Sequence, residues 1–295
     1  MDVAVTGATG LIGTWLTRRL TASGHRVLRV VRTPGGSDTV SWDPATGTID
    51  AGALEGIDAV VHLAGAPIAD KRWTTEQKAL IRTSRTQSTD LLARTLAALR
   101  RPPTVLLSGS AIGYYGDTGD RPTDESGPPG DDFLGRLCVE WESAAQPAVD
   151  AGIRTALLRT GVVLSTEGGA LAKQLPYFRI GLGGRSGSGR QYLSWISIDD
   201  EVSAIEWLLT NDVSGPVNLT APEPVTNAAF AKALGKALHR PTSIIPMIGP
   251  RVLFGRDLAD NLLLTSQRIV PKALTTAGYP FRHGTLESAL EDVLR

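Results

Sequence analysis

The sequence contains a single cysteine and no long apolar run. Cys138 has no second cysteine to pair with, so an internal disulfide is impossible, which fits a reducing compartment. No stretch approaches the roughly 18 consecutive apolar residues of a membrane-spanning helix. The amino terminus shows neither the basic nor the apolar region of a secretory signal. We therefore expect a cytoplasmic protein that does not insert into a membrane.

An excess of charge of either sign is also missing. The 30 Lys and Arg residues balance the 30 Asp and Glu residues, so the formal net charge is zero. A neutral chain offers no overall positive field to attract nucleic acid, and we expect no nucleic-acid partner. No Cys and His cluster has the spacing of metal ligands, so we expect no metal. The 295 residues suffice for one large domain or two coupled domains, in a monomer or a homodimer.

What the sequence does contain is an alternation of short apolar runs with longer helical patterns. This alternation over the first two thirds is typical of stacked βαβ units. Right-handed crossovers would join the strands into an α/β fold, a doubly wound Rossmann-type parallel sheet covered on both faces. The expected strands are residues 3–6, 27–31, 40–42, 59–63, 105–108 and 155–159, and the expected helices are 11–22, 75–99, 132–151 and 200–210.

The pattern changes after about residue 165. Dense glycine up to Arg190 predicts a loop-rich segment without regular elements. A strand–helix–strand pattern returns at 195–219, and the segment 222–295 is mainly helical with prolines between its helices. We therefore predict a Rossmann domain from 1–165 and about 191–221. A smaller, mainly helical substrate and C-terminal domain would comprise about 166–190 and 222–295.

A glycine-rich turn follows the first strand directly. The residues Gly7-Ala8-Thr9-Gly10-Leu11-Ile12-Gly13 follow an apolar strand and open an amphipathic helix. Glycine is needed where the backbone approaches a pyrophosphate and where helix packs on strand. The free N–H groups at the start of the helix suit phosphate. The context predicts a dinucleotide site at Gly7, Thr9, Gly10, Leu11, Ile12 and Gly13.

The end of the second strand distinguishes the two nicotinamide cofactors. An NAD site places an acid there, about 20 residues past the glycines, to bind the ribose 2′-hydroxyl. This chain has Arg32 at that point and no acid until Asp38. Guanidinium groups match phosphate oxygens with paired donors, so Arg32 indicates a 2′-phosphate and the cofactor NADP(H). The alternative is a solvated arginine at a strand end.

The exit of the next strand reads His62-Leu63-Ala64-Gly65. Small residues there let the backbone approach a ligand at the carboxyl edge of a parallel sheet. We predict that the backbone of all four residues adjoins the cofactor. The imidazole of His62 has either a cofactor role or none beyond that of a polar strand-end residue.

These motifs, with others along the whole chain, resemble those of a known family. The chain resembles atypical extended short-chain dehydrogenases/reductases, in the NAD(P)-dependent epimerase-like branch with a C-terminal domain of unknown function. The resemblance implies NADP binding, an epimerase-like fold, and positions facing the cofactor at Arg85 and Val162. The matching segments are 7–13, 63–65, 108–116 and 158–164, with Trp42-Asp43, Arg72-Trp73, Ser84-Arg85, Cys138, Trp141-Glu142, 191–200 and Ser266-Gln267-Arg268.

The catalytic residues of that superfamily are not evident. Its Tyr-x-x-x-Lys pair aligns with Phe133 and Leu137, neither of which exchanges protons. Both would project from one helix face toward the nicotinamide. The family's serine falls on Ala111, or on Ser110 after an inserted residue. Ser110 and Tyr114 are therefore the candidate catalytic residues.

Two acids near these segments have two interpretations each. Asp199 is either a proton donor or, with Asp200, the N-cap of the helix that follows, and the sequence favours the cap. Glu142 is either a proton donor or a charge on a helix surface. The function expected is an NADP-dependent oxidoreductase or epimerase-like enzyme acting on an unknown small molecule without the usual Tyr–Lys pair. The alternative is a non-catalytic NADP(H)-binding redox sensor.

Overall fold

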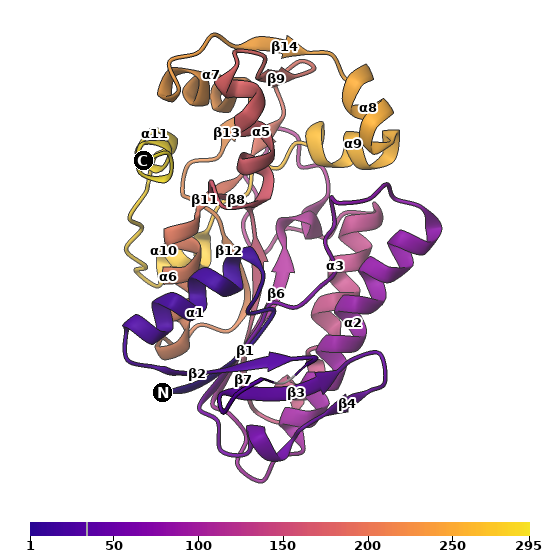
Figure 1. Ribbon diagram of the computed structural model, residues 1–295, viewed down its shortest axis with the longest axis vertical. Coiled ribbons are helices and arrows are strands. Elements are labelled where there is room, and N and C mark those ends of the chain that lie inside the picture. The colour runs from indigo at the N-terminus through magenta and orange to yellow at the C-terminus, as the bar shows by residue number, and fades with distance from the viewer. Residues whose placement is uncertain (34) are drawn as a thin grey trace.

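An eight-stranded sheet organises the larger part of the chain (Figure 1). The computed structural model describes residues 1–33 and 35–295. The strand order is β12-β7-β6-β5-β1-β2-β3-β4, and all neighbours are parallel except β3 and β4. The chain builds outward from β1 to β4 and then returns to β5 on the other side of β1. Ligands of such sheets bind at this switch point, at the carboxyl ends of the strands.

The bounds of the sheet strands and their covering helices follow the predicted pattern closely. The strands are β1 (Asp2–Thr6), β2 (Arg26–Val31), β3 (Thr39–Asp43), β4 (Thr48–Ile49), β5 (Ala59–His62), β6 (Val105–Ala111), β7 (Arg154–Thr160) and β12 (Gly215–Leu219). The helices are α1 (Leu11–Ala22), α2 (Thr75–Ala97), α3 (Phe133–Ser143), α4 (Gln146–Asp150) and α6 (Ile198–Thr210), with short 3-10 turns η1 (Gly52–Leu54) and η2 (Ile112–Tyr115). The doubly wound α/β prediction is confirmed.

Apolar residues cover both faces of the sheet. Val3, Val5 and Val61 point to the side of α1 and α6, where they join one buried cluster. Ala4 and Val60 point to the opposite side, in a second cluster with residues of α2 and α4. Alternate strand residues thus supply two cores, as a parallel sheet requires.

A smaller part of the chain lies beyond the carboxyl edge of the sheet (Figure 1). Its own buried cluster includes Phe178, Trp195, Phe230 and Leu290. The assignment of residues to two domains remains a prediction. Its elements, with those that connect it to the sheet, are β8 (Val162–Leu164), α5 (Gly169–Arg179), β9 (Gly184–Ser186), β10 (Tyr192–Leu193), β11 (Trp195–Ser197), β13 (Val225–Thr226), α7 (Asn227–Ala237), β14 (Ser243–Ile245), α8 (Ile248–Phe254), α9 (Arg256–Leu263), α10 (Lys272–Thr276) and α11 (Leu286–Val293).

Three sequence predictions about elements are wrong. Residues 132–151 do not form one helix, because α3 ends at Ser143 and α4 begins at Gln146, next to Pro147. The glycine-rich segment is not a continuous loop, because it contains α5 and β9. The N-cap of α6 is neither Asp199 nor Asp200: the Ser197 hydroxyl accepts from the Asp200 N–H.

None of the described helices is long and apolar enough to cross a membrane.

Candidate functional site

Two glycines of the turn after β1 are required by packing. Gly7 has a positive φ of 67°, and a Cβ there would lie 2.8 Å from the carbonyl carbon of Leu63. A Cβ at Gly13 would lie 2.2 Å from the carbonyl oxygen of Gly7. Any side chain at either position would therefore collide with backbone. Gly7 and Gly13 fix the close approach of β1, α1 and the exit of β5.

Gly10 differs from the other two glycines because a Cβ there would be tight against one backbone atom but would collide with none. A Cβ at Gly10 would meet a single heavy atom within 4 Å, the Gly7 carbonyl oxygen at 3.3 Å. Gly10 is also the N-cap of α1, where no side chain caps the helix and no acid occupies the first turn. Thr9 is exposed, and Leu11 and Ile12 are half-buried. The first N–H groups of α1 are therefore available to an anion at this end of the helix.

Arg32 lies just past the end of β2 and is exposed. The first acid after it, Asp38, accepts a hydrogen bond from Arg26 Nε at 3.1 Å. Among the residues that the structure describes, no carboxylate pairs with Arg32. The guanidinium is thus free of protein counter-charge where an NADP site needs a base.

The His62 imidazole is enclosed in the core. Its Nδ1 lies 2.7 Å from the Thr6 hydroxyl and its Nε2 lies 2.9 Å from the Thr89 hydroxyl. Burial lowers the pKa of His62 to about 4, so the ring is neutral. The Thr6 hydroxyl also accepts from the N–H groups of Leu63 and Ala64, at 3.0 and 3.2 Å. His62 therefore supports the exit of β5 from the core side, through the Thr6 hydroxyl. The predicted contact of the His62 backbone with the cofactor stays a prediction.

Arg85 reaches from α2 to the segment that follows β5. Its Nη1 donates to the Ala66 carbonyl at 3.0 Å and to the Ile81 carbonyl at 3.1 Å. The guanidinium carbon lies 5.0 Å from the centre of the Trp141 ring. A Cβ at Gly65 would lie 3.2 Å from the same carbon, so the missing side chain of Gly65 makes room for Arg85.

The start of α3 packs against two different parts of the chain. The Phe133 ring packs edge-on against Trp73, with centroids 5.1 Å apart, and Lys78 Nζ lies 5.1 Å from it. The side chains that face Gly113, in the turn η2 that follows β6, are Leu134 and Cys138, at 3.3 and 3.9 Å from a Cβ placed there. The expectation that Phe133 and Leu137 project from one helix face toward the nicotinamide stays a prediction.

Neither Leu134 nor Cys138 is suited to proton exchange. Leu134 has no ionisable group. Burial, and secondarily the Glu142 carboxylate, raise the pKa of the Cys138 thiol to about 12. Cys138 is thus a neutral, buried side chain near neutral pH.

The candidate catalytic residues adjoin a buried ion pair. Arg159, on β7, chelates the Glu142 carboxylate with Nε and Nη2, each at 2.8 Å. Ser110 donates to Glu142 Oε1 at 2.6 Å. The Tyr114 ring covers the guanidinium, with its centre 3.4 Å from the Arg159 Cζ. Glu142 is therefore neither a surface charge nor a free acid, and the Ser110 hydroxyl is engaged by it.

Val162 begins β8, beside the carboxyl end of β7. It is half-buried, and its N–H donates to the Ser194 carbonyl at 2.9 Å. Two residues earlier, at the end of β7, the Thr160 hydroxyl donates to the buried Glu201. Among the described residues, no group of three or more His, Cys, Asp and Glu side chains is arranged to hold a metal ion.

Comparison with known proteins places this geometry in a family. Residues 3–220 match the NAD dependent epimerase/dehydratase family, and residues 245–293 match a domain of unknown function, DUF1731. The chain belongs to the NAD dependent epimerase/dehydratase family. The resemblance inferred from the sequence is thereby confirmed, including the C-terminal domain of unknown function.

Relatives of this epimerase family align along the whole chain. The epimerase family protein MT2273 of Mycobacterium tuberculosis is 47% identical over 291 residues, which are 98% of this chain and 96% of that protein. The Homo sapiens epimerase family protein SDR39U1 is 39% identical over 300 residues, with 100% of both chains covered.

Solved structures of the epimerase family share the fold. The crystal structure of human SDR39U1 (isoform 2) with NADPH has a TM-score of 0.91 and 37% identity, and covers 99% of both chains. The UDP-N-acetylglucosamine 4-epimerase of Bacillus cereus has a TM-score of 0.77 at 17% identity, covering 99% of this chain and 98% of that one. The second likeness concerns the fold alone.

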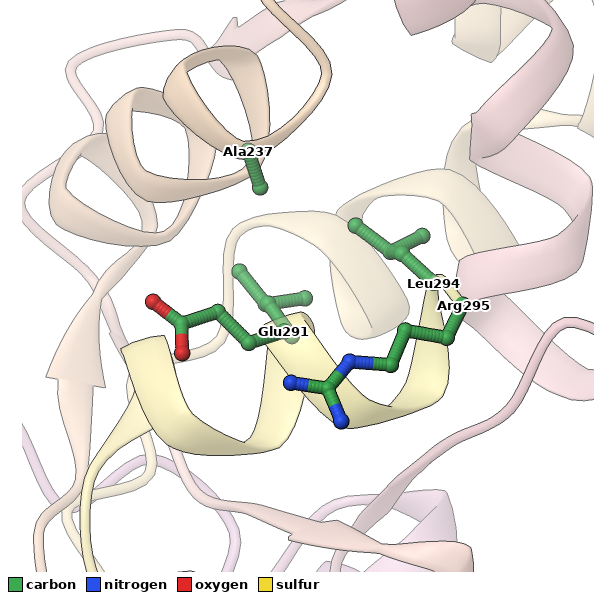
Figure 2. A pocket seen from close by; sticks show the side chains of 5 residues that line it. Ala237, Glu291, Leu294 and Arg295 are labelled. Atoms are coloured by element: carbon green, nitrogen blue, oxygen red, sulfur yellow. The ribbon is translucent and has the colours of Figure 1, made fainter.

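A separate hollow lies between α7 and α11 of this family member (Figure 2). Its volume is about 310 Å³, and its walls are formed by Ala237, Leu290, Glu291, Leu294 and Arg295. None of these residues belongs to the glycine turn or to the carboxyl edge of the sheet. We therefore do not connect it with the nucleotide.

The sequence singled out Glu142 but predicted neither its pairing with Arg159 nor the burial of Glu201. Glu142 and Arg159 are 17 positions apart, and their pairing depends on α3 folding over β7. Glu201 is fully buried at the start of α6, and burial raises the pKa of its carboxyl to about 8. The sequence signal for these contacts was the presence of charged residues within otherwise apolar segments, which indicates charges buried in pairs or networks.

Proposed function

We propose that this chain binds NADP(H) along the carboxyl edge of its sheet and acts as an NADP-dependent oxidoreductase or epimerase-like enzyme on a small molecule. The observation that carries the proposal is the open Gly10 N-terminus of α1 together with Arg32, which has no carboxylate partner among the described residues. The NADPH found with human SDR39U1 supports it. We also propose a cytoplasmic location.

The residues present fit a dinucleotide phosphate. The first turn of α1 would receive the pyrophosphate, and Arg32 would receive the 2′-phosphate. The predicted cofactor contacts of Thr9, Leu11, Ile12, Val162 and the segment 62–65 belong to the same proposal. The nicotinamide, when bound, supplies hydride transfer, whereas the chain's own groups hold and orient the reactants.

The proton chemistry of this site would differ from that of the usual Tyr–Lys pair. Phe133 and Leu137, which align with that pair, exchange no protons, and Leu134 and Cys138, which face η2, are also unsuited to the role. Ser110 is engaged by Glu142. The Tyr114 hydroxyl has no hydrogen-bond partner among the described residues, and its ring lies over the Arg159 cation. We therefore propose Tyr114 as the candidate proton donor.

A second function from another class has support in the same observation. Phe133 and Leu137, which align with the usual Tyr–Lys pair, favour a non-catalytic NADP(H)-binding redox sensor. Incubation with NADPH and a panel of carbonyl compounds, followed by absorbance, separates the two functions. Oxidation of NADPH that Tyr114→Phe slows by about 10²-fold or more supports the enzyme. Tight NADPH binding with no oxidation across the panel supports the sensor.

A further inference from the structure

Arg85 leaves most of its hydrogen-bonding capacity unused within the protein. A guanidinium has five N–H donors. Nη1 of Arg85 donates to two carbonyls, whereas no described residue accepts a hydrogen bond from Nε or Nη2. No carboxylate of the described residues lies within 4.0 Å of this cation. Arg85 is thus a half-buried cation without a protein counter-charge.

Two other arginines that are partly or fully buried show which hydrogen-bond acceptors a guanidinium finds inside this protein. Arg159 places Nε and Nη2 on the two oxygens of Glu142, at 2.8 Å each. Arg154 uses Nη1 and Nη2 to bind three carbonyls near the end of α6, at 2.9–3.1 Å. In Arg85 the donors without a protein partner are Nε and Nη2, the same fork that Arg159 uses for a carboxylate.

The surroundings of Arg85 place this fork near the switch point of the sheet. The guanidinium lies against Gly65 at the exit of β5 and over the Trp141 ring of α3. Burial lowers the pKa of Arg85, so the environment disfavours its charge. A charge that is partly removed from water is stabilised by an opposite charge and hydrogen bonds. The missing partner is therefore an anion.

We propose that Nε and Nη2 of Arg85 bind a carboxylate group of the substrate. This inference rests on the proposed function and adds a substrate class, small carboxylic acids. A planar two-oxygen anion matches the guanidinium fork, as Glu142 matches Arg159. A phosphate of the cofactor has the same chemistry, but the first turn of α1 and Arg32 already account for the cofactor's phosphates.

Arg85 would hold and orient this substrate and would not exchange protons with it. A guanidinium stays protonated throughout the working pH range. Gly65 has a defined part in the arrangement, because a Cβ there would lie 3.2 Å from Cζ and 3.4 Å from Nη1 of Arg85. Gly65→Ala should therefore displace the fork and weaken the same interaction.

The test uses oxalate as the probe and the intact protein saturated with NADP⁺. Calorimetry compares oxalate binding by the wild type, Arg85→Met and Arg82→Met. Arg82 is the matched control, since it lies on the same helix, is exposed and pairs with Glu140. We expect Arg85→Met to weaken oxalate binding about tenfold or more, while Arg82→Met binds like the wild type.

Parallel NADPH titrations distinguish the two sources of an anion. The family resemblance places Arg85 facing the cofactor, whereas this inference assigns its free fork to the substrate. We therefore expect the NADPH dissociation constant of Arg85→Met to stay within about threefold of the wild type. A tenfold or greater loss of NADPH affinity with unchanged oxalate binding would show that the fork serves the cofactor and would overturn the inference. Failure of the wild type to bind oxalate would also overturn it. Failure of the wild type to bind NADPH would instead contradict the proposed function.

A conservative variant keeps the test decisive if Arg85→Met does not fold. Arg85→Lys retains the positive charge but has no planar fork. We expect it to bind NADPH normally and oxalate more weakly than the wild type. Oxalate binding equal to that of the wild type would refute the bidentate geometry.

Discussion

At the scale of residues, the three glycines of the turn have separable roles. A Cβ at Gly7 or Gly13 would collide with backbone, whereas a Cβ at Gly10 would collide with no atom, and the φ of Gly10 is an ordinary −75°. We predict that Gly10→Val remains folded but loses NADPH binding, because its branched side chain occupies the phosphate position. Fluorescence titration with NADPH, together with circular dichroism, checks both parts.

Gly13→Val is the control for this prediction. Its Cβ would lie 2.2 Å from the Gly7 carbonyl oxygen, so it should lower the melting temperature strongly. Wild-type NADPH affinity in folded Gly10→Val would show that the phosphate site has been misplaced.

Glu201 carries a second prediction, about pH. Burial raises the pKa of this carboxyl from 4.5 to about 8, so the folded state retains a proton that the unfolded state has released. The contribution of this proton to the free energy of unfolding is complete below the pKa of the unfolded state, 4.5. It is lost as the pH rises from there through the pKa of the folded state, about 8. Between these two pKa values the free energy of unfolding falls by about 1.4 kcal/mol for each pH unit.

Urea unfolding at pH 6 and pH 9 measures the effect. We expect the wild type to lose about 2–3 kcal/mol more than Glu201→Gln over this interval, because the amide is neutral at both pH values. The difference between the two proteins removes the contribution of all other titrating groups. Equal pH dependence in both would mean that Glu201 is already ionised in the folded protein.

At the scale of elements, the buried pair of Glu142 and Arg159 joins α3 to β7. Their side chains are 9% and 4% exposed. We predict that Glu142→Ala lowers the free energy of unfolding by about 3–5 kcal/mol, because it leaves the Arg159 charge buried without a partner. Chemical denaturation gives the value.

Glu140→Ala on the same helix is the matched control. Glu140 pairs with Arg82 at the surface, so its loss should cost no more than about 1 kcal/mol. Similar losses in the two variants would show that the pair of Glu142 and Arg159 has no special weight in joining the two elements.

The elements also show where prediction from sequence succeeds and where it stops. The alternation of β1, α1 and β2 follows local patterns, and the sequence was sufficient to place these elements. Helix α5 was missed because glycines at 168 and 169 obscured an apolar face at Leu171, Leu175 and Phe178, spaced as on one side of a helix.

At the scale of the whole molecule, polar contacts connect the segment after β5 with the smaller part of the chain. Lys173 pairs with Asp70 at 2.8 Å, Arg72 donates to the carbonyls of Val252 and Leu253, and Lys78 pairs with Asp257. The segment that leaves β5 beside the glycine turn is thus bound to α5 and α8, and the first turn of α2, which follows this segment, is bound to α9. Such contacts between distant parts of the chain have no local sequence signal.

The central claim is that the carboxyl edge of the sheet binds NADP(H) and selects it through Arg32. Calorimetric titration of the wild type and Arg32→Ala with NADPH and with NADH tests this claim most directly. We predict that the wild type binds NADPH more tightly than NADH. Arg32→Ala should lose about 1.5–3 kcal/mol of NADPH binding, the scale of hydrogen bonds to charged groups, with little change for NADH. Tighter wild-type binding of NADH, or equal losses for both cofactors in Arg32→Ala, would contradict the account.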